Sequence, residues 1–412
     1  MVEPSQPVLK DDDPQHLQDD DVEEMIEKGI EPEDHDMSDS EESDSGHESE
    51  SETAGVEGQN QETFQDESVQ GFFEHTDSIY CIAISPSNSD LCATGGGDDT
   101  AYLWSITSGE RLSTLSGHSD SITSIEFSFD GQLLATASMD GTIRIWTLQG
   151  ERVINGDDVK VLEAGSEVLW MQFHPRGHVL IAGTSDSTVW MWHASKGEVM
   201  KVFAGHTAAS TYGCWARDGK SFASVSEDGT IILWDPVSAT PRNRWETSQD
   251  DRLSGGDMGW NIIALNSSGM ICTVGSAEGK AKVINLANGA LLASLETQTD
   301  SIEAIVYATT LPLLAIASID GSIALYEVPS MKLRSILRHD DAVVGLHFEP
   351  ATPFLFSIST DATVRQWDVR TSTEVQRWHG HQDTILCMAV QRGCKKIVTA
   401  GDDKAALVFS QS

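Results

Sequence analysis

Residues 137–146 read ASMDGTIRIW, a stretch that starts with small residues, turns at an Asp-Gly pair and ends in an alternating run closed by Trp146. The same pattern returns elsewhere in the chain. The copies are GDDTAYLW at 97–104, SDSTVWMW at 185–192, EDGTIILW at 227–234, TDATVRQW at 360–367, and the weaker AEGKAKVI at 277–284, IDGSIALY at 319–326 and GDDKAALV at 401–408. The chain therefore contains one hairpin-like unit in eight copies, which indicates a repeat architecture.

The spacing of these copies identifies the kind of repeat. Their last residues are Trp104, Trp146, Trp192, Trp234, Ile284, Tyr326, Trp367 and Val408. A period of 40–45 residues with Asp and Trp near its end is typical of WD40 propeller blades. From about residue 66 onward the chain resembles this family, which implies an all-β, eight-bladed WD40 β-propeller over residues 66–412. The last copy ends near residue 408, so blade 8 lacks an outer strand. We expect residues 67–73 to supply that strand and to close the ring.

The charge of the chain is strongly negative and unevenly distributed. Asp and Glu number 65 against 26 Lys and Arg, a net charge of −39. Residues 1–65 are rich in acids, and the stretch 11–52 within them has almost no aromatic or β-branched residues, which predicts a disordered acidic tail. Within it, Ser38, Ser45 and Ser49 each precede an acid by three positions, so they are candidate sites for an acid-directed kinase. The charge argues against direct binding to nucleic acid or an anionic membrane and favours a basic partner.

Several functional classes lack a signal in this sequence. The six cysteines are scattered without a CxxC pair, which indicates reduced thiols in a cytoplasmic or nuclear protein. We find neither an apolar signal segment nor a run of 18 apolar residues. Because no nucleotide-binding, metalloprotease, hydrolase or kinase motif is present, we expect no catalytic residue, no cofactor and no metal. We expect the protein to act as a monomer.

Three repeats carry a His, Ser, Asp and Trp set that could suggest a hydrolase. The sets are His118, Ser138, Asp140 and Trp146; His206, Ser226, Asp228 and Trp234; and His339, Ser359, Asp361 and Trp367. An active site would be unique, whereas these sets recur around the ring. We therefore interpret them as the structural tetrads of WD40 blades, in which buried polar groups satisfy one another. The last repeat keeps His381 and Asp402 and ends in Val408.

A second recurring feature is an acidic residue just before each expected inner strand. The positions are Asp77, Asp120, Asp300, Asp341 and Asp383, with Glu167 and Asp257 at neighbouring positions in two further repeats. In WD40 rings this loop lies on the top face, around the mouth of the central channel. Two interpretations remain open. Asp in such a loop can cap a local turn, or the carboxylates can together form a docking ring for Lys and Arg side chains.

Three segments narrow the resemblance further. GGGDDTAYLW at 95–104, VLWMQFHPRGHVLIAGTSDSTVWMW at 168–192 and GDDKAALVF at 401–409 resemble the family of the angio-associated migratory cell protein and its fungal ribosome-assembly counterpart. The resemblance implies a dedicated chaperone that captures the basic N-terminal segment of a large-subunit ribosomal protein of the L ten, or universal L sixteen, type. The alternative is a general WD40 interaction scaffold, such as a substrate receptor for ubiquitin ligation or a signalling adaptor. A scaffold predicts a mixed or apolar top face.

Overall fold

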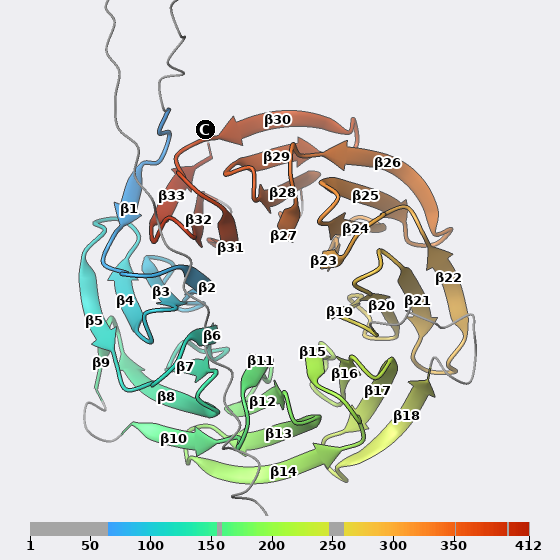
Figure 1. Cartoon of the computed structure of the whole chain (residues 1–412), viewed down its shortest axis with the longest axis horizontal. Coiled ribbons are helices and arrows are strands. Elements are labelled where there is room, and N and C mark those ends of the chain that lie inside the picture. The colour runs from blue at the N-terminus through green and yellow to red at the C-terminus, as the bar shows by residue number, and fades with distance from the viewer. Residues whose placement is uncertain (1–64, 155–158, 247–258, 351, 394, 412) are drawn as a thin grey trace, which may run out of the picture. The chain divides into compact units, whose positions relative to one another are not determined.

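The computed structural model describes residues 65–154, 159–246, 259–350, 352–393 and 395–411. These residues form eight antiparallel sheets arranged around a central axis, as Figure 1 shows. The predicted eight-bladed propeller is confirmed. The tail with Ser38, Ser45 and Ser49, and the loop residue Asp257, lie outside the described residues.

The strands occupy four positions from the axis outward. The inner strands are β2 (Ile79–Ile84), β6 (Ile122–Phe127), β11 (Val168–Phe173), β15 (Ser210–Trp215), β19 (Ile262–Leu265), β23 (Ile302–Tyr307), β27 (Val343–Phe348) and β31 (Ile385–Val390). The second strands are β3 (Leu91–Gly96), β7 (Leu133–Ser138), β12 (Val179–Thr184), β16 (Phe222–Ser226), β20 (Ile271–Gly275), β24 (Leu313–Ser318), β28 (Phe354–Ser359) and β32 (Lys396–Gly401).

The third strands are β4 (Ala101–Ser105), β8 (Thr142–Gln149), β13 (Thr188–His193), β17 (Thr230–Asp235), β21 (Ala281–Asn285), β25 (Ser322–Glu327), β29 (Val364–Asp368) and β33 (Ala406–Ser410). The outer strands are β5 (Arg111–Leu115), β10 (Lys160–Glu163), β14 (Glu198–Ala204), β18 (Thr240–Glu246), β22 (Leu291–Leu295), β26 (Lys332–Arg338), β30 (Thr373–Trp378) and β1 (Gln70–Phe72). The short β9 (Arg152–Val153) pairs with β8.

The two ends of the described chain meet in blade 8. Strand β1 pairs antiparallel with β33, with Gln70 opposite Val408 and Phe72 opposite Ala406. The pairing therefore falls within the predicted segment 67–73, and Figure 1 shows β1 beside β33. This arrangement covers the free edge of the last blade, which a propeller needs in order to avoid an unpaired strand.

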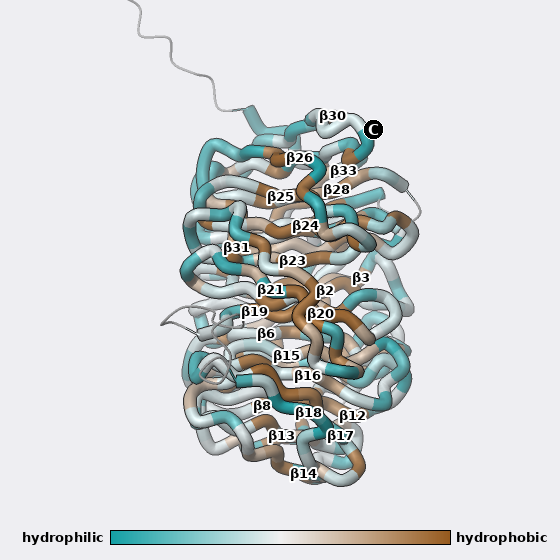
Figure 2. Tube along the Cα trace, turned by 90° about the vertical axis from the view of Figure 1, so that its right-hand side faces the viewer, coloured by the Kyte–Doolittle hydropathy of each residue, from teal (hydrophilic) through white to brown (hydrophobic). Residues whose placement is uncertain are grey.

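The core lies between neighbouring blades rather than within one sheet. In one cluster Leu103 and Leu91 of blade 1 pack with Leu134 and Trp146 of blade 2. Alternate residues of each strand face the two neighbouring sheets, which accounts for strands such as β7 that are buried along their whole length. In Figure 2 the apolar residues concentrate in the middle of the propeller and the hydrophilic ones toward its two faces.

The turns between second and third strands share one backbone conformation. The residue after the turn acid has positive φ in every blade, for example 79° at Gly141 and 64° at Lys404. Lys404 therefore corresponds to Gly141, and Asp403 to Asp140. The strand pairing agrees, because Ala400 faces Ala406 as Ala137 faces Ile143. The expectation of Asp402 and Val408 at these positions in blade 8 was wrong by one residue, since two adjacent aspartates make the register ambiguous in sequence.

Candidate functional site

The direction of the strands assigns every loop to one of two faces. Each inner strand runs from the first face to the second, and antiparallel pairing returns the next strand to the first face. The loop before each inner strand and the turn between second and third strands therefore lie together. We call this side the acidic face, and we call the side with the remaining turns the opposite face.

The tetrad of blade 2 ties the two kinds of loop on the acidic face together. His118 precedes the inner strand, and its Nδ1 lies 3.0 Å from Asp140 Oδ2 in the turn. Its Nε2 lies 2.8 Å from Thr136 Oγ1, which also accepts a hydrogen bond of 3.1 Å from Trp146 Nε1. All polar atoms of this chain of contacts are satisfied, so the network can be buried at little cost.

The protonation states in this network follow from its hydrogen bonds. Burial alone would raise the pKa of Asp140, but hydrogen bonds from Thr142, Ser119 and His118 lower it to about 2. Burial lowers the pKa of His118 and outweighs the effect of Asp140. The neutral imidazole then donates from Nδ1 to the carboxylate and accepts at Nε2 from the Thr136 hydroxyl. Neither ring nitrogen is left to act as a general base.

The sequence-based prediction of the hydroxyl member of each tetrad was wrong. The hydroxyls that bridge His and Trp belong to Thr136, Ser224 and Ser357, not to Ser138, Ser226 and Ser359. Ser138 instead donates to the backbone oxygen of Asp120 at 2.8 Å and accepts from the backbone N–H of Asp140. Residues two apart on a strand share a face, so two small hydroxyl residues could not be distinguished by pattern alone.

The other sets follow the same arrangement, with one difference in blade 4. His206 Nδ1 lies 2.6 Å from Thr230 Oγ1 and 3.8 Å from Asp228, so the threonine mediates that contact. In blade 8, His381 contacts Asp403 and Thr399, both at 2.8 Å. His339 contacts Asp361 directly at 2.9 Å. The recurrence of one arrangement around the ring is what a structural network requires.

The five aspartates predicted just before the inner strands, which we call the rim aspartates, occupy equivalent positions and are all exposed on the acidic face. In each, one carboxylate oxygen accepts a hydrogen bond from the backbone N–H of the next residue, at 2.7 to 2.8 Å. The residues are Asp77, Asp120, Asp300, Asp341 and Asp383. Glu167 is exposed in the corresponding loop of blade 3. The carboxylates thus cap the local backbone with one oxygen, and the second oxygen is available to a partner.

Further acids surround this rim. The loops before the inner strands carry Glu74, Asp77, Asp120, Glu167, Glu296, Asp300, Asp340, Asp341 and Asp383. The turns between second and third strands carry Asp98, Asp99, Asp140, Asp186, Glu227, Asp228, Glu278, Asp320, Asp361, Asp402 and Asp403. Within the described parts of these loops the bases are Lys280, bonded to Glu278 at 2.8 Å, and Lys404, bonded to the Thr76 oxygen at 2.7 Å.

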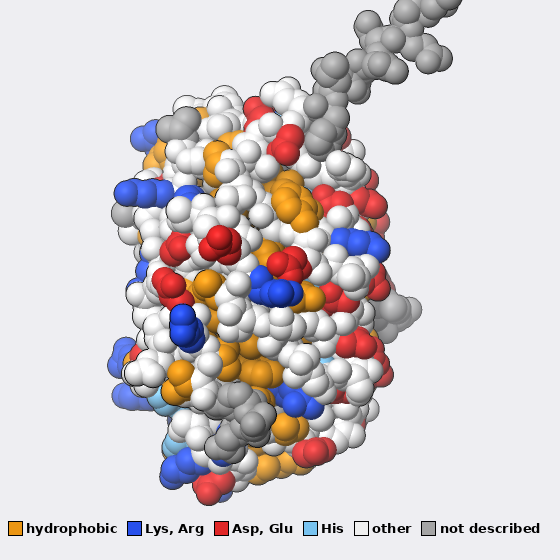
Figure 3. Space-filling model, turned by 90° about the vertical axis from the view of Figure 1, so that its left-hand side faces the viewer, with side chains coloured by type: hydrophobic (Ala, Val, Ile, Leu, Met, Phe, Trp, Pro, Cys, Tyr) orange, Lys and Arg blue, Asp and Glu red, His pale blue; other side chains and the backbone are white. Residues whose placement is uncertain are grey.

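The opposite face has a different balance of charge. Its turns carry Arg176, Lys196, Arg217, Lys220, Arg370, Arg392 and Lys395, together with Asp90, Glu110, Asp130, Glu151, Asp218 and Glu349. In the side view of Figure 3 most Lys and Arg side chains lie toward one edge of the propeller, and Asp and Glu side chains are more numerous toward the other. The negative potential is therefore concentrated on one face, where it would attract a cationic ligand.

Within the described residues no group of three or more His, Cys, Asp and Glu side chains is placed to hold a metal ion. No helix in that part of the chain is long and apolar enough to cross a membrane.

Comparisons with known proteins agree with the fold. The WD domain, G-beta repeat family matches residues 66–105, 109–147, 197–235, 331–368 and 372–410. An uncharacterized WD repeat-containing protein of Schizosaccharomyces pombe is 38% identical over 350 residues, covering 84% of this chain and 86% of that protein. The human angio-associated migratory cell protein is 32% identical over 359 residues, covering 84% and 80%.

Relatives from fungi include proteins of stated function. The ribosome assembly protein SQT1 of Saccharomyces cerevisiae is 28% identical over 382 residues, covering 83% of this chain and 86% of that protein. The crystal structure of Chaetomium thermophilum Sqt1, bound to the N-terminus of the ribosomal protein L10, superposes with a TM-score of 0.78 at 29% identity, covering 84% of this chain and all of that one. The chain belongs to the WD40-repeat family of the angio-associated migratory cell protein and Sqt1.

Proposed function

We propose that this protein is a dedicated chaperone that captures the basic N-terminal segment of a large-subunit ribosomal protein on its acidic face. The observation that carries the proposal is the ring of exposed carboxylates before the inner strands. Each of the five rim aspartates uses one oxygen for its own backbone and keeps the other free. A Lys- or Arg-rich segment would relieve the repulsion among these charges.

The relatives support the choice of partner. Sqt1 of Chaetomium thermophilum was crystallised with the N-terminus of the ribosomal protein L10, and that of Saccharomyces cerevisiae is named a ribosome assembly protein. We infer the same class of partner for this chain, bound through Asp77, Asp120, Glu167, Asp257, Asp300, Asp341 and Asp383. The acidic tail would extend the negative surface and shield the captured segment from RNA.

The role we propose is binding without catalysis. The histidines that could suggest a hydrolase have both ring nitrogens engaged in blades 2, 7 and 8. With a net charge of −39 the chain repels the phosphates of nucleic acid and of anionic lipid. We propose that it works as a monomer in the cytoplasm or nucleus, without direct contact to nucleic acid or membrane.

The experiment that tests this function is affinity purification of the protein from its own cells, followed by identification of the bound proteins. The wild type is compared with a variant in which Asp120, Asp341 and Asp383 are each changed to Asn. Asn keeps an acceptor oxygen for the local N–H but removes the charge. We expect ribosomal protein L10 with the wild type at low salt, and its loss at high salt or in the variant. Ubiquitin-ligase or signalling components retained by both would favour the general scaffold instead.

A further inference from the structure

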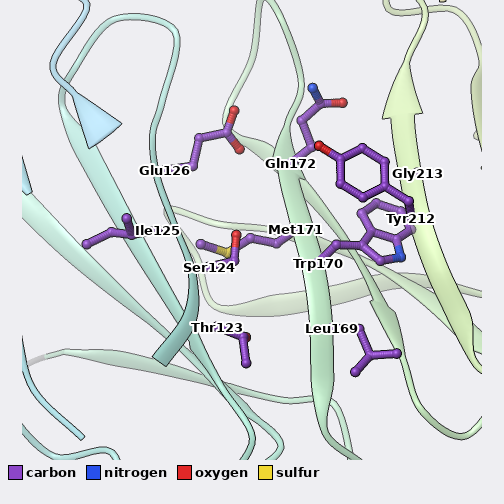
Figure 4. A pocket seen from close by; sticks show the side chains of 10 residues that line it. All are labelled: Thr123, Ser124, Ile125, Glu126, Leu169, Trp170, Met171, Gln172, Tyr212 and Gly213. Carbon is purple, nitrogen blue, oxygen red and sulfur yellow. The ribbon is translucent and has the colours of Figure 1, made fainter. Parts of the chain in front are cut away.

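The wall of the central channel contains a pocket of about 360 Å³ between β6, β11 and β15. Glu126, Gln172 and Tyr212 line it, with Trp170 and Ser124. In Figure 4 the polar ends of Glu126, Gln172 and Tyr212 lie toward the same end of the pocket, whereas Thr123 and Leu169 lie toward the other. The pocket therefore combines a carboxylate, an amide and a phenol.

Glu126 stands alone as an acid in its layer of the channel. The residues at the equivalent place of the other inner strands are Ala83, Gln172, Cys214, Ala264, Val306, His347 and Ala389. Glu126 Oε2 accepts a hydrogen bond of 2.6 Å from the backbone N–H of Phe173 on the next inner strand. Among the described residues no ion pair reaches this carboxylate, and its Oε1 accepts no other hydrogen bond.

The bridge to the next strand does not explain why this position carries an acid. Gln172 makes the same kind of bridge, because its Oε1 accepts a hydrogen bond of 2.7 Å from the backbone N–H of Trp215. An amide is therefore sufficient to link two inner strands. A half-buried carboxylate without a cation is costly, and burial raises the pKa of Glu126 to about 8. Burial of this carboxylate is unfavourable, and the described residues provide no cation that compensates for it. We therefore infer that Glu126 serves to bind a ligand.

The aromatic side chains around Glu126 indicate which ligand. Tyr212 is 41% exposed, and its ring stacks on Trp170 with ring centroids 6.4 Å apart. The face of an exposed tyrosine ring attracts a cation. Burial, with Cys214 and Glu126 nearby, raises the pKa of Tyr212 to about 12, so its phenol stays neutral. A carboxylate and an aromatic face that line the same pocket are suited to a Lys ammonium or an Arg guanidinium.

We propose that this pocket is a subsite for one Lys or Arg side chain of the basic segment, with Glu126 as its counter-ion and Tyr212 as its platform. The subsite rests on the proposed function, since the same segment would bind the acidic face. Glu126 lies four residues after the start of β6, about 13 Å along the strand. A Lys or Arg side chain of a segment that lies on the acidic face is shorter than this distance. The proposal therefore requires the end of the segment itself to enter the channel.

The proposal makes binding depend on pH in a defined direction. A cation beside Glu126 favours its ionised form, so binding releases a proton wherever the free carboxyl is protonated. Affinity then rises with pH up to about 8 and levels off above it, by at most about tenfold per pH unit. Of the elements packed against β6, β7 and β11 carry no titratable side chain, β2 carries Tyr80 and Cys81, and β3 carries Cys92. On the far side of the pocket, β15 carries Tyr212 and Cys214. Tyrosine and buried cysteine side chains titrate well above this range.

The test is calorimetric titration with an acetylated peptide of the N-terminal segment of ribosomal protein L10, at about pH 6.5 and pH 9. Acetylation removes the α-amino group, which would titrate in the same range. Glu126→Gln should weaken binding by about tenfold to a hundredfold at the higher pH and by less than about threefold at the lower. Glu163→Gln, on the exposed outer strand of the same blade, should change neither value.

Two further measurements separate the possible results. Tyr212→Leu removes the platform without touching Glu126 and should weaken binding severalfold at both pH values. Replacing each peptide Lys or Arg in turn by Gln should identify one residue whose loss is not additive with Glu126→Gln. If Glu126→Gln and Tyr212→Leu bind like the wild type, the subsite is refuted while capture on the acidic face stands. If the wild type itself does not bind the peptide, the proposed function fails, and the subsite with it.

Discussion

Phe72 and Phe73 offer a direct test of how the ring is closed. Phe72 is 2% exposed, whereas Phe73 is 69% exposed. The Phe72 ring stacks on Trp104 with centroids 5.2 Å apart, and it packs with Ile79 and Val408. Truncating a buried phenylalanine to alanine costs about 3 to 5 kcal/mol. At about 2 °C per kcal/mol for a large domain, Phe72→Ala should lower the melting temperature by about 6 to 10 °C.

The matched control and two truncations complete this test. Phe73→Ala should change the melting temperature by no more than about 1 °C. Deleting residues 1–60 should leave it nearly unchanged, because this acidic segment has too few apolar residues to add to the core. Deleting residues 1–74 removes Phe72, its ladder with β33 and the hydrogen bond from the Glu67 N–H to the His379 oxygen, so the loss should exceed that of Phe72→Ala. Thermal unfolding followed by circular dichroism measures all four. Equal melting of the two truncations would refute closure by β1.

Three further predictions concern the tetrads and the channel. Thr136→Val keeps the shape of the side chain but leaves His118 Nε2 and Trp146 Nε1 without a partner. Denaturant titration should therefore show that the free energy of unfolding falls by about 2 to 4 kcal/mol. A fall of less than about 0.5 kcal/mol would contradict the bridging role of Thr136. Trp146→Ala should cost about 3 to 5 kcal/mol, and Asp140→Asn should likewise lower stability. The folded fraction of Trp146→Ala should bind the L10 peptide with wild-type affinity. That of Asp140→Asn, which loses one charge of the acidic face, should bind within about threefold of it. The pKa of Glu126 is raised on folding, so the native state holds a proton that the unfolded state releases, and stability falls as pH rises from about 4.5 to 8. Glu126→Gln should therefore raise the melting temperature at pH 8 and leave it unchanged near pH 4. An equal shift at both pH values would contradict the raised pKa.

The fold was predictable because the repeat itself carries the information. Eight copies of the same hairpin with a Trp or an apolar residue at its end fix the number of blades, and the missing outer strand after residue 408 indicates where the N-terminal strand pairs. The rim aspartates were also predictable, since each precedes a recognisable inner strand. Their exposure and their backbone hydrogen bonds follow from that position.

The details that sequence could not settle depend on register and on the closed ring. Thr136 and Ser138 share a face of β7, and the positions of the Trp146 indole nitrogen and of His118 Nε2 select Thr136. Asp402 and Asp403 are adjacent, and it takes the positive φ of Lys404, the strand register and the His381 contact to select Asp403. Glu126 is one of three polar residues in ITSIEF. That it is the only acid at its level of the channel appears only when the eight inner strands are aligned by their pairing.

The central claim is that the carboxylates of the acidic face recognise a basic segment. Three exposed acids that each lose an attraction and gain a repulsion of about 0.5 kcal/mol account for about 3 kcal/mol, or about a hundredfold in affinity. This is the effect expected for Asp120→Lys, Asp341→Lys and Asp383→Lys combined. The corresponding Asn variant, which keeps the backbone caps, should lose about half of that free energy.

The measurement that tests the claim most directly is a fluorescence titration of these variants with the L10 peptide between about 0.1 and 1 M salt, over which the screening length falls from about 10 to about 3 Å. The control reverses three exposed acids of the opposite face, Glu110, Glu151 and Asp218, and carries the same net charge. We predict that the wild type and the control bind tightly at low salt and weaken as salt rises, whereas the variant of the acidic face binds about a hundredfold more weakly while remaining folded. Equal affinity of the two triple variants, or a wild-type affinity indifferent to salt, would contradict recognition by this face.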